Sequence, residues 1–448
     1  MTTVRRWTGH ETRALRQAMR MSIRAFASYL GVGVRTVAGW ESSAGVSPRP
    51  EMQAALDTAL ARASDEVKAR FALILDAGRP DPQPVRTGIA PPGVRSALLA
   101  PREWNRHTTD DLTAFLAGDG DLDDHAALRL AHEWRIVDPP QVVEVHAGRR
   151  VGERLARVIE ERIEALRRMD DVLGGGEVHD LVHRELRVTL DLLRGASYSE
   201  KTGRRLLGAV ADLCQLAGWV AGDAGLYPLA ERYYLGGVSA AHAADDRRLA
   251  AHLLSSLAYQ KANVGDPREA VLLARSAEQG AETTAGRTRA LLYGRIAWAS
   301  ARCGDAPTVD RALAEVDRAL DRAEPEADPS WLYWLDRDEA QIMAGRCMTE
   351  LRRAAPAVEL LQDAIGRYDD TRTRELALYL SWLAEAHVYS NNIDEAARVA
   401  SLALQLSALV SSVRCHARLR TLRGLLSQYR QSATVREFEE EARQVLGP

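Results

Sequence analysis

Residues 22–41 read SIRAFASYLGVGVRTVAGWE, and this stretch predicts two short helices separated by a tight turn. Ser22 is a good N-cap for a helix over residues 23–30, because its hydroxyl can accept a hydrogen bond from an amide of the first turn. The Gly31-Val32-Gly33 segment predicts a turn, since glycine reaches backbone angles that other residues reach only at a cost. A second helix is expected over residues 34–41. Two helices at this spacing are typical of a helix-turn-helix unit.

These residues closely resemble the XRE (lambda-repressor-like) family, with a small cap, then F-A-x-x-L-G-V, then x-x-T-V-x-x-W-E. The resemblance covers about residues 10–63, including an amphipathic helix over 10–20 and closing helices in PRPEMQAALDTALARA. It implies that the third helix enters the major groove of DNA with its N-terminal residues foremost. Arg35 is the one base-contacting side chain able to pair bidentately with guanine. By this resemblance, the base contacts come from Val34, Arg35 and Thr36, and the phosphate contacts from Ser22, Arg24 and Arg49.

Two positions depart from the family pattern. Ile23 stands where the family often has glutamine, and Gly39 stands where it often has a polar residue before the tryptophan. Fewer base contacts are therefore expected, so that one head alone is weakly specific. A homodimer that reads two half-sites would compensate.

The charge of the chain is unevenly distributed. Residues 1–80 hold 12 basic and 7 acidic side chains, a net +5, so residues 81–448 carry −8 of the total of −3. A basic head on an acidic body is typical of a nucleic-acid reader joined to another module. Between them, residues 76–101 contain six of the 17 prolines and predict a semi-stiff spacer.

From these features we expect an all-α chain of four parts, with a DNA-binding head at 1–75, a linker at 76–101, a helical connector at 102–204 and a repeat domain at 205–448. In the connector, residues 149–171 predict one long helix with an apolar stripe that includes Leu155, Val158, Ile159 and Ile163.

The body contains an internal repeat with a period of 39 to 48 residues. A small residue recurs on the first helix of each expected pair, at Gly218, Ala258, Ala297, Gly345 and Ala384. Twelve residues later the second helix carries Ala230, Ala270, Val309, Ala357 or Ala396. This spacing resembles the tetratricopeptide repeat over about residues 205–410, although that family has a period of 34. Residues 411–448 are expected to form a capping helix pair.

A solenoid of this kind presents the first helix of each pair on its concave side. The inward-facing position after each small residue carries Trp219, Tyr259, Trp298, Arg346 and Glu385. These residues predict a groove with an apolar end and a charged end, suited to a peptide or a planar small molecule with a carboxylate. The competing interpretation is that the aromatic rings only fill space between helices.

Other patterns are too incomplete to predict chemistry. His179 and His183 have a zinc-compatible spacing without a further ligand nearby, which favours an exposed face. Asp119, Asp121 and Asp123 open like a calcium loop but lack its glycine and its final glutamate. Because there is neither a phosphate-binding GxxxxGK[ST] loop nor a GxSxG elbow, we expect no enzyme activity, metal or cofactor.

The sequence therefore predicts a sequence-specific DNA-binding transcriptional regulator that binds a double-stranded operator as a homodimer. Its repeat domain is expected to dimerise and to sense a peptide or small-molecule effector. This layout resembles peptide-sensing regulators of the Rap/PlcR type. The alternative is an interaction scaffold whose repeats dock a partner protein. We expect a cytoplasmic protein with no membrane span, since no long apolar run occurs. Only three of the 59 basic residues are lysine, which favours a GC-rich source such as an actinobacterium.

Overall fold

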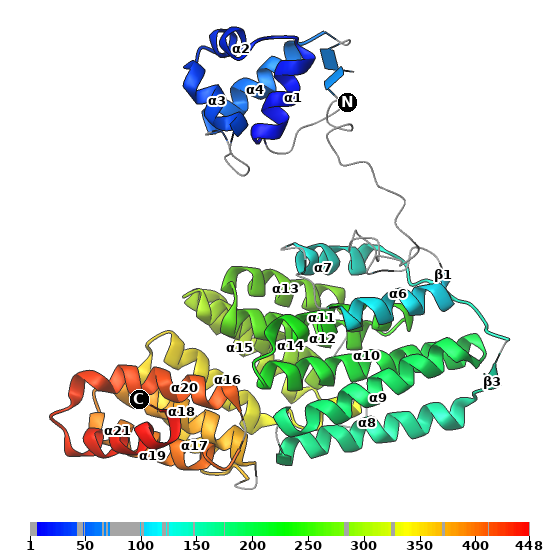
Figure 1. The fold of residues 1–448 in the computed structure, drawn as a ribbon. Helices are drawn as coiled ribbons and strands as arrows, with labels where there is room; N and C mark the ends of the chain where they lie inside the picture. Colours follow the sequence, from blue (N-terminus) through cyan, green and yellow to red (C-terminus); the bar gives the residue numbers. More distant parts are fainter. Residues whose placement is uncertain are drawn as a thin grey trace. The chain divides into compact units, whose positions relative to one another are not determined.

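A computed structural model describes the chain over residues 7–42, 48, 50–64, 67, 68, 70, 71, 99, 103–118, 122, 125–146, 148–173, 175–281, 286–323, 328–369, 372–410 and 412–447. The chain divides into two compact units, Met1–Ala90 and Pro91–Pro448, which we call the head and the body. The division falls inside the predicted linker, most of which lies outside the described residues. The described residues are almost entirely helical, which confirms the all-α class (Figure 1). In this part of the chain, no helix has the length and apolar character needed to span a membrane.

Among its described residues, the head includes the helices α1 (Gly9–Ala18), α2 (Ile23–Leu30), α3 (Val34–Ser42) and α4 (Pro50–Arg62). The Ser22 hydroxyl accepts a hydrogen bond from the amide of Ala25 at 3.2 Å, as expected of an N-cap. Gly31 adopts a left-handed conformation with φ of 69°, which explains why glycine ends α2. The two expected helices of the helix-turn-helix unit are thus present.

Large side chains from each helix of the head meet in a small core. The buried side chains are those of Trp7, Leu15, Phe26, Val37, Trp40, Leu56 and Phe71. The Glu41 carboxylate accepts two hydrogen bonds from the Arg16 guanidinium, at 2.7 and 2.8 Å. This bidentate pair ties α3 to α1.

The body begins with a helical segment and short strands. Its elements are β1 (Glu103–Trp104), α6 (Arg106–Ala117), α7 (Ala126–Ile136), β2 (Gln141–Val142), β3 (Arg149–Arg150), α8 (Glu153–Leu173), α9 (Gly175–Gly195) and β4 (Ala196–Ser197). The predicted helix over 149–171 is therefore wrong at its start, because Arg149 and Arg150 pair in parallel with Ala196 and Ser197. Its predicted stripe is also wrong in part. Ile159 and Ile163 are buried, whereas Leu155 and Val158 are exposed.

In the described part of the body, six helix pairs follow. They are α10 (Glu200–Asp223) with α11 (Tyr227–Ala243), α12 (Arg247–Val264) with α13 (Pro267–Gly280), α14 (Gly286–Arg302) with α15 (Ala306–Asp321), α16 (Arg337–Glu350) with α17 (Ala354–Ile365), α18 (Thr373–Tyr389) with α19 (Ile393–Ser407), and α20 (Val413–Leu426) with α21 (Ala433–Leu446). All ten predicted small or apolar positions of the repeat are buried. At Gly218 a Cβ atom would lie 2.5 Å from the ring of Tyr234, so glycine allows α10 and α11 to approach closely.

The connector and the repeats form one unit, and α10 runs across the predicted boundary at residue 204.

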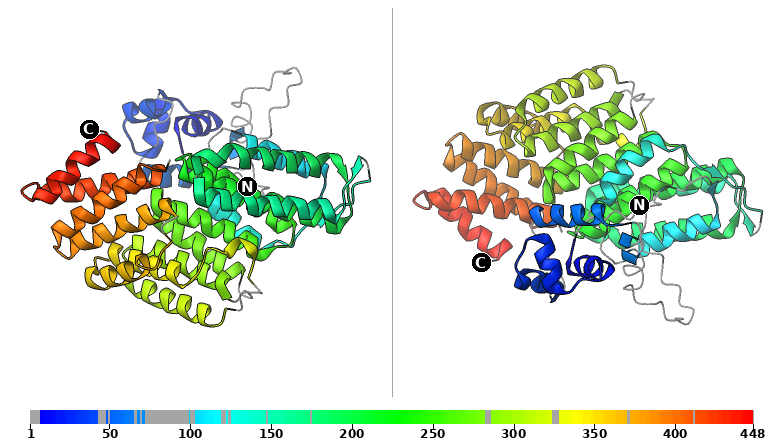
Figure 2. Two further views of the ribbon diagram at one scale, coloured as in Figure 1. Left: turned by 90° about the horizontal axis from the view of Figure 1, so that it is seen from below. Right: turned by 90° about the horizontal axis from the view of Figure 1, so that it is seen from above.

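The long period between the third and fourth pairs has a structural cause. After α15 the chain contains the 3-10 helix η2 (Ser330–Leu332), where the ring of Trp331 stacks on His252 of α12 with centroids 4.1 Å apart. The pairs follow a curved path (Figure 2), and α20 returns to α10, since Arg414 contacts Asp223 at 2.6 Å. The described part of the body is therefore a solenoid whose ends meet. The short 3-10 helix η3 (Ser427–Tyr429) lies between α20 and α21.

Candidate functional sites

The first candidate site is the face formed by the starts of α2 and α3 in the head. Five of the six predicted DNA-contacting residues lie here and are exposed, namely Ser22, Arg24, Val34, Arg35 and Thr36. The sixth, Arg49, lies outside the described residues. Neither Arg24 nor Arg35 forms an ion pair or hydrogen bond with another described residue. Two guanidinium groups are thus free to meet an external anion or a base edge.

The second candidate site is a cavity of about 620 Å³ on the concave side of the body. The first helices of all six pairs contribute to its lining, together with the C-terminal half of α8 and the segment that follows η2. All five predicted groove residues line it, which are Trp219, Tyr259, Trp298, Arg346 and Glu385. The predicted spacing therefore brings together side chains that are up to 166 positions apart in the sequence.

Aromatic rings form much of this wall. Trp219 and Tyr259 stack with centroids 6.0 Å apart and an interplanar angle of 24°. Trp298 meets Trp382 edge-on at 5.2 Å. The rings thus pack against neighbouring helices and line a cavity at the same time, so the two interpretations offered by the sequence are not exclusive.

The predicted separation into an apolar end and a charged end is wrong. The Arg346 guanidinium lies over the ring of Trp298 at 4.5 Å and donates a hydrogen bond to the Tyr259 hydroxyl at 3.0 Å. Glu385 pairs with Arg418, whose guanidinium lies over Trp382 at 3.5 Å. Charge and aromatic surface are therefore interleaved, because a guanidinium is stabilised over a π-face when it is removed from water.

Several residues of the cavity were not predicted. Arg295 precedes Trp298 by three positions on α14, and Trp382 precedes Glu385 by three on α18, so each lies one turn from a predicted position. Helical spacing could have found both. Arg414 and Arg418 could not be found in this way, because they lie on α20, which was expected to belong to the capping helix pair rather than to the groove.

The charges of this wall shift the titration of Tyr259. Burial opposes ionisation of its hydroxyl, but the charges of Arg346, Arg414 and Arg295 outweigh burial and lower the pKa of Tyr259 to about 8. Burial also lowers the pKa of Arg295 to about 10, with the charge of Arg346 adding to the effect. Both shifts indicate an excess of positive charge around Tyr259.

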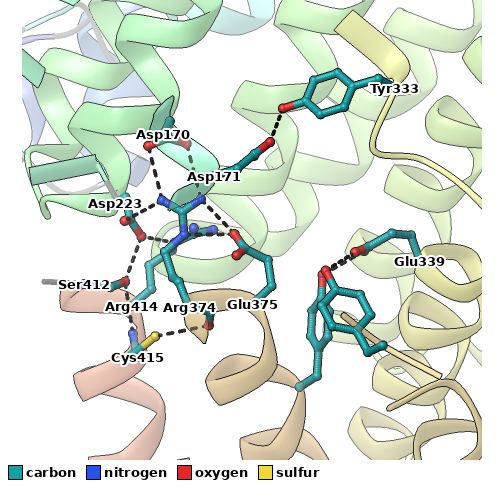
Figure 3. Close-up of polar contacts among 12 residues, drawn as sticks. Asp170, Asp171, Asp223, Tyr333, Glu339, Arg374, Glu375, Ser412, Arg414 and Cys415 are labelled. Atoms are coloured by element: carbon teal, nitrogen blue, oxygen red, sulfur yellow. Dashed lines mark hydrogen bonds and ion pairs between the residues drawn. The ribbon is translucent and has the colours of Figure 1, made fainter. Parts of the chain in front are cut away.

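Buried ion pairs hold the two ends of the solenoid together beside the cavity (Figure 3). Arg374 of α18 contacts Asp170 of α8 at 3.2 Å and Asp223 of α10 at 3.4 Å. Asp223 also accepts hydrogen bonds from Arg414 at 2.6 Å and from Ser412 at 2.8 Å. Burial alone would raise the pKa of Asp223, but Arg414 and Arg374 outweigh it and lower that pKa. We call Asp170, Asp223, Arg374 and Arg414 the closing cluster.

A second acid with a shifted pKa, the half-buried Glu339, lies on α16. The Glu339 carboxylate accepts hydrogen bonds of 2.7 Å from the hydroxyls of Tyr368 and Tyr379 (Figure 3). Burial raises the pKa of Glu339 to about 7, although the two tyrosine hydrogen bonds oppose the shift. This group therefore changes charge near neutral pH.

The histidine pair of α9 does not lie on an exposed face as expected. His179 and His183 are half-buried and stack on each other, and His183 shares a hydrogen bond of 2.8 Å with the Tyr233 hydroxyl. Packing against α11 accounts for the ring of His183, and the ring of His179 stacks on it. The three aspartates that resemble a calcium loop, Asp119, Asp121 and Asp123, lie outside the described residues.

No family model matches this chain, and a search of curated proteins found no match. Functional conclusions therefore depend on the geometry of the two sites.

Proposed function

We propose that this chain is a DNA-binding transcriptional regulator whose body senses a small effector. The observation that carries the proposal is the exposed first turn of α3, where Arg35 forms no contact with a described carboxylate in a head of net charge +5. Exposed arginines at the start of such a helix suit guanine edges and phosphates. The XRE-like pattern of the same residues supports this proposal.

A mobility-shift assay on genomic and random DNA, repeated at several salt concentrations, tests it. We expect Arg35→Ala to weaken specific binding by about 1–3 kcal/mol and to relax the preference for one base. Arg24→Ala should weaken binding equally on all sequences and lower the salt slope by about one. Arg275→Ala, which removes an exposed arginine from α13, is the matched control and should bind like the wild type. If the wild type shows no salt-sensitive binding, the scaffold interpretation replaces this one.

We further propose that the regulator acts as a homodimer through α8. Six exposed residues of α8 follow one another at alternating spacings of three and four positions. Five of them have apolar side chains and the third is an arginine; they are Leu155, Val158, Arg162, Ala165, Met169 and Val172. This is the spacing of a coiled-coil seam, which is covered by another helix. A second copy of α8 supplies such a helix and also brings two heads together.

Sedimentation of the full chain tests the dimer. Met169→Glu places a charge in the seam and should yield monomers, whereas Leu409→Glu changes an equally apolar exposed side chain elsewhere and should leave the dimer intact. A monomeric wild type would contradict the proposal.

A further inference from the structure

Two arginines in the cavity are buried without an acidic partner. The side chains of Arg295 and Arg346 are only 5% and 7% exposed, and neither forms an ion pair with a described residue. The Nε–H of each has no acceptor in the described part of the chain. Neighbouring arginines differ, since Arg374, Arg414 and Arg418 each contact a carboxylate.

Both unpaired guanidinium groups lie against the same tyrosine. The Arg295 guanidinium is 4.4 Å from the centroid of the Tyr259 ring, and the Arg346 guanidinium is 5.5 Å from it. Like charges this close disfavour each other, and buried charges without counter-ions are strongly disfavoured. Tyr259 does not supply the missing negative charge at pH 7, because its pKa of about 8 leaves it mostly protonated. A ligand that brings one negative charge would relieve both arginines.

The rest of the cavity limits what that ligand is. The rings of Trp219, Tyr259, Trp298 and Trp382 line it, which favours a flat apolar part. A volume of about 620 Å³ is that of a small-molecule site. Nine arginines and six carboxylates line the cavity. Among the buried arginines of this wall, only Arg295 and Arg346 form no ion pair with a described residue, so a single negative charge between them is what the site lacks.

We propose that this cavity binds a small aromatic carboxylate, with its carboxylate between Arg295 and Arg346 and its ring against the aromatic wall. A carboxylate has two oxygens, so each of the two guanidinium groups can donate a charge-assisted hydrogen bond to one of them. The inference rests on the proposed sensing role of the body and names the chemical class of its effector.

Calorimetric titration of the full chain with benzoate, salicylate and indole-3-acetate tests this inference. We expect at least one of these acids to bind, and its neutral amide to bind at least about tenfold more weakly. Arg295→Met and Arg346→Met should each weaken acid binding by about tenfold or more. Arg353→Met, which changes an arginine that pairs on the surface with Asp310, is the matched control and should bind normally.

Thermal unfolding without ligand gives a second, independent readout. Methionine keeps much of the apolar stem but removes the uncompensated charge, so Arg295→Met and Arg346→Met should raise the Tm or leave it unchanged. A lowered Tm for both variants would show that the arginines are structural and would overturn the inference.

Further arms separate the sources of the anion. A short peptide with a free C-terminal tryptophan, compared with its amidated form, tests a peptide carboxylate, and phenyl phosphate tests a phosphate. If that peptide or phenyl phosphate binds and none of the three acids does, the small-carboxylate assignment is overturned. It is also overturned if none of these compounds binds. Operator binding without acid binding would refute this inference alone. Acid binding without any DNA shift would refute the regulator proposal alone.

Discussion

Asp223→Asn removes one negative charge from the closing cluster while preserving the shape of the side chain. The Asp223 side chain is fully buried and accepts three bonds, from Arg414, Arg374 and Ser412. Asparagine keeps one acceptor oxygen but turns its NH₂ group toward a guanidinium donor. Removing one partner of a buried ion pair destabilises a protein by about 3–5 kcal/mol, because the remaining charges stay buried. We expect a loss of free energy of unfolding in that range.

Urea unfolding of the full chain, followed by far-UV circular dichroism, measures this loss. Asp310→Asn is the matched control, because Asp310 pairs with Arg353 at 2.6 Å where both side chains are well exposed. Exposed pairs contribute little, so this control should unfold like the wild type.

The pH dependence provides a further check on the same variant. Because the pKa of Asp223 is lowered in the folded state, its contribution is complete above the ordinary value of 3.8 and is lost as the pH falls through the folded pKa. The difference between wild type and Asp223→Asn should therefore shrink in acid. If Asp223→Asn unfolds at the same urea concentration as Asp310→Asn at neutral pH, the closing cluster does not hold the ends together.

Three other outcomes are expected from the structure. Because the pKa of Glu339 is raised in the folded state, this group keeps its proton between about pH 4.5 and 7, where the unfolded chain has lost it. As the pH rises through this window, the free energy of unfolding of the wild type should fall by about 3 kcal/mol more than that of Glu339→Gln. Urea unfolding at several pH values measures this difference, and the same pH dependence for both proteins would contradict the assignment. Gly9→Ala would place a Cβ atom 1.9 Å from the Trp40 carbonyl oxygen. In calorimetry, the melting transition of the head should therefore be lost while that of the body remains. A head that melts at the same temperature as in the wild type would refute the close approach. A thiol reagent should label one cysteine of the native chain, Cys303, since the other three are buried, and mass spectrometry that finds native labelling at Cys214, Cys347 or Cys415 would count against this packing.

The helix-turn-helix unit could be predicted closely because local signals determine it. Ser22 and Gly31 set the ends of α2 through bonds that span only a few residues. The repeat could be predicted for a related reason. Each small position faces its own helix partner, so the same steric requirement recurs along the chain and leaves a visible period.

The charged residues of the cavity wall were less predictable. Arg414 lies on the last helix pair, and only the return of α20 to α10 places it beside Trp219, with its guanidinium 4.7 Å from the ring. Contacts between residues almost 200 positions apart leave no local pattern. The exposed side of α8 was misread for another reason, because Leu155 and Ile159 are both apolar and composition alone does not tell which one faces the core.

In an open repeat array each unit touches only its neighbours, so stability is close to a sum of local terms and the terminal units fray first. Because the closing cluster links the two ends of the array, the stability of the body is not a sum of independent local contributions. When α20 detaches, Asp223 on the first pair loses Arg414 as well, so the terminal pair cannot fray without a penalty at the opposite end of the array. The body should therefore unfold as one cooperative unit. A structural change at any repeat that separates the two ends lowers the stability of all six pairs.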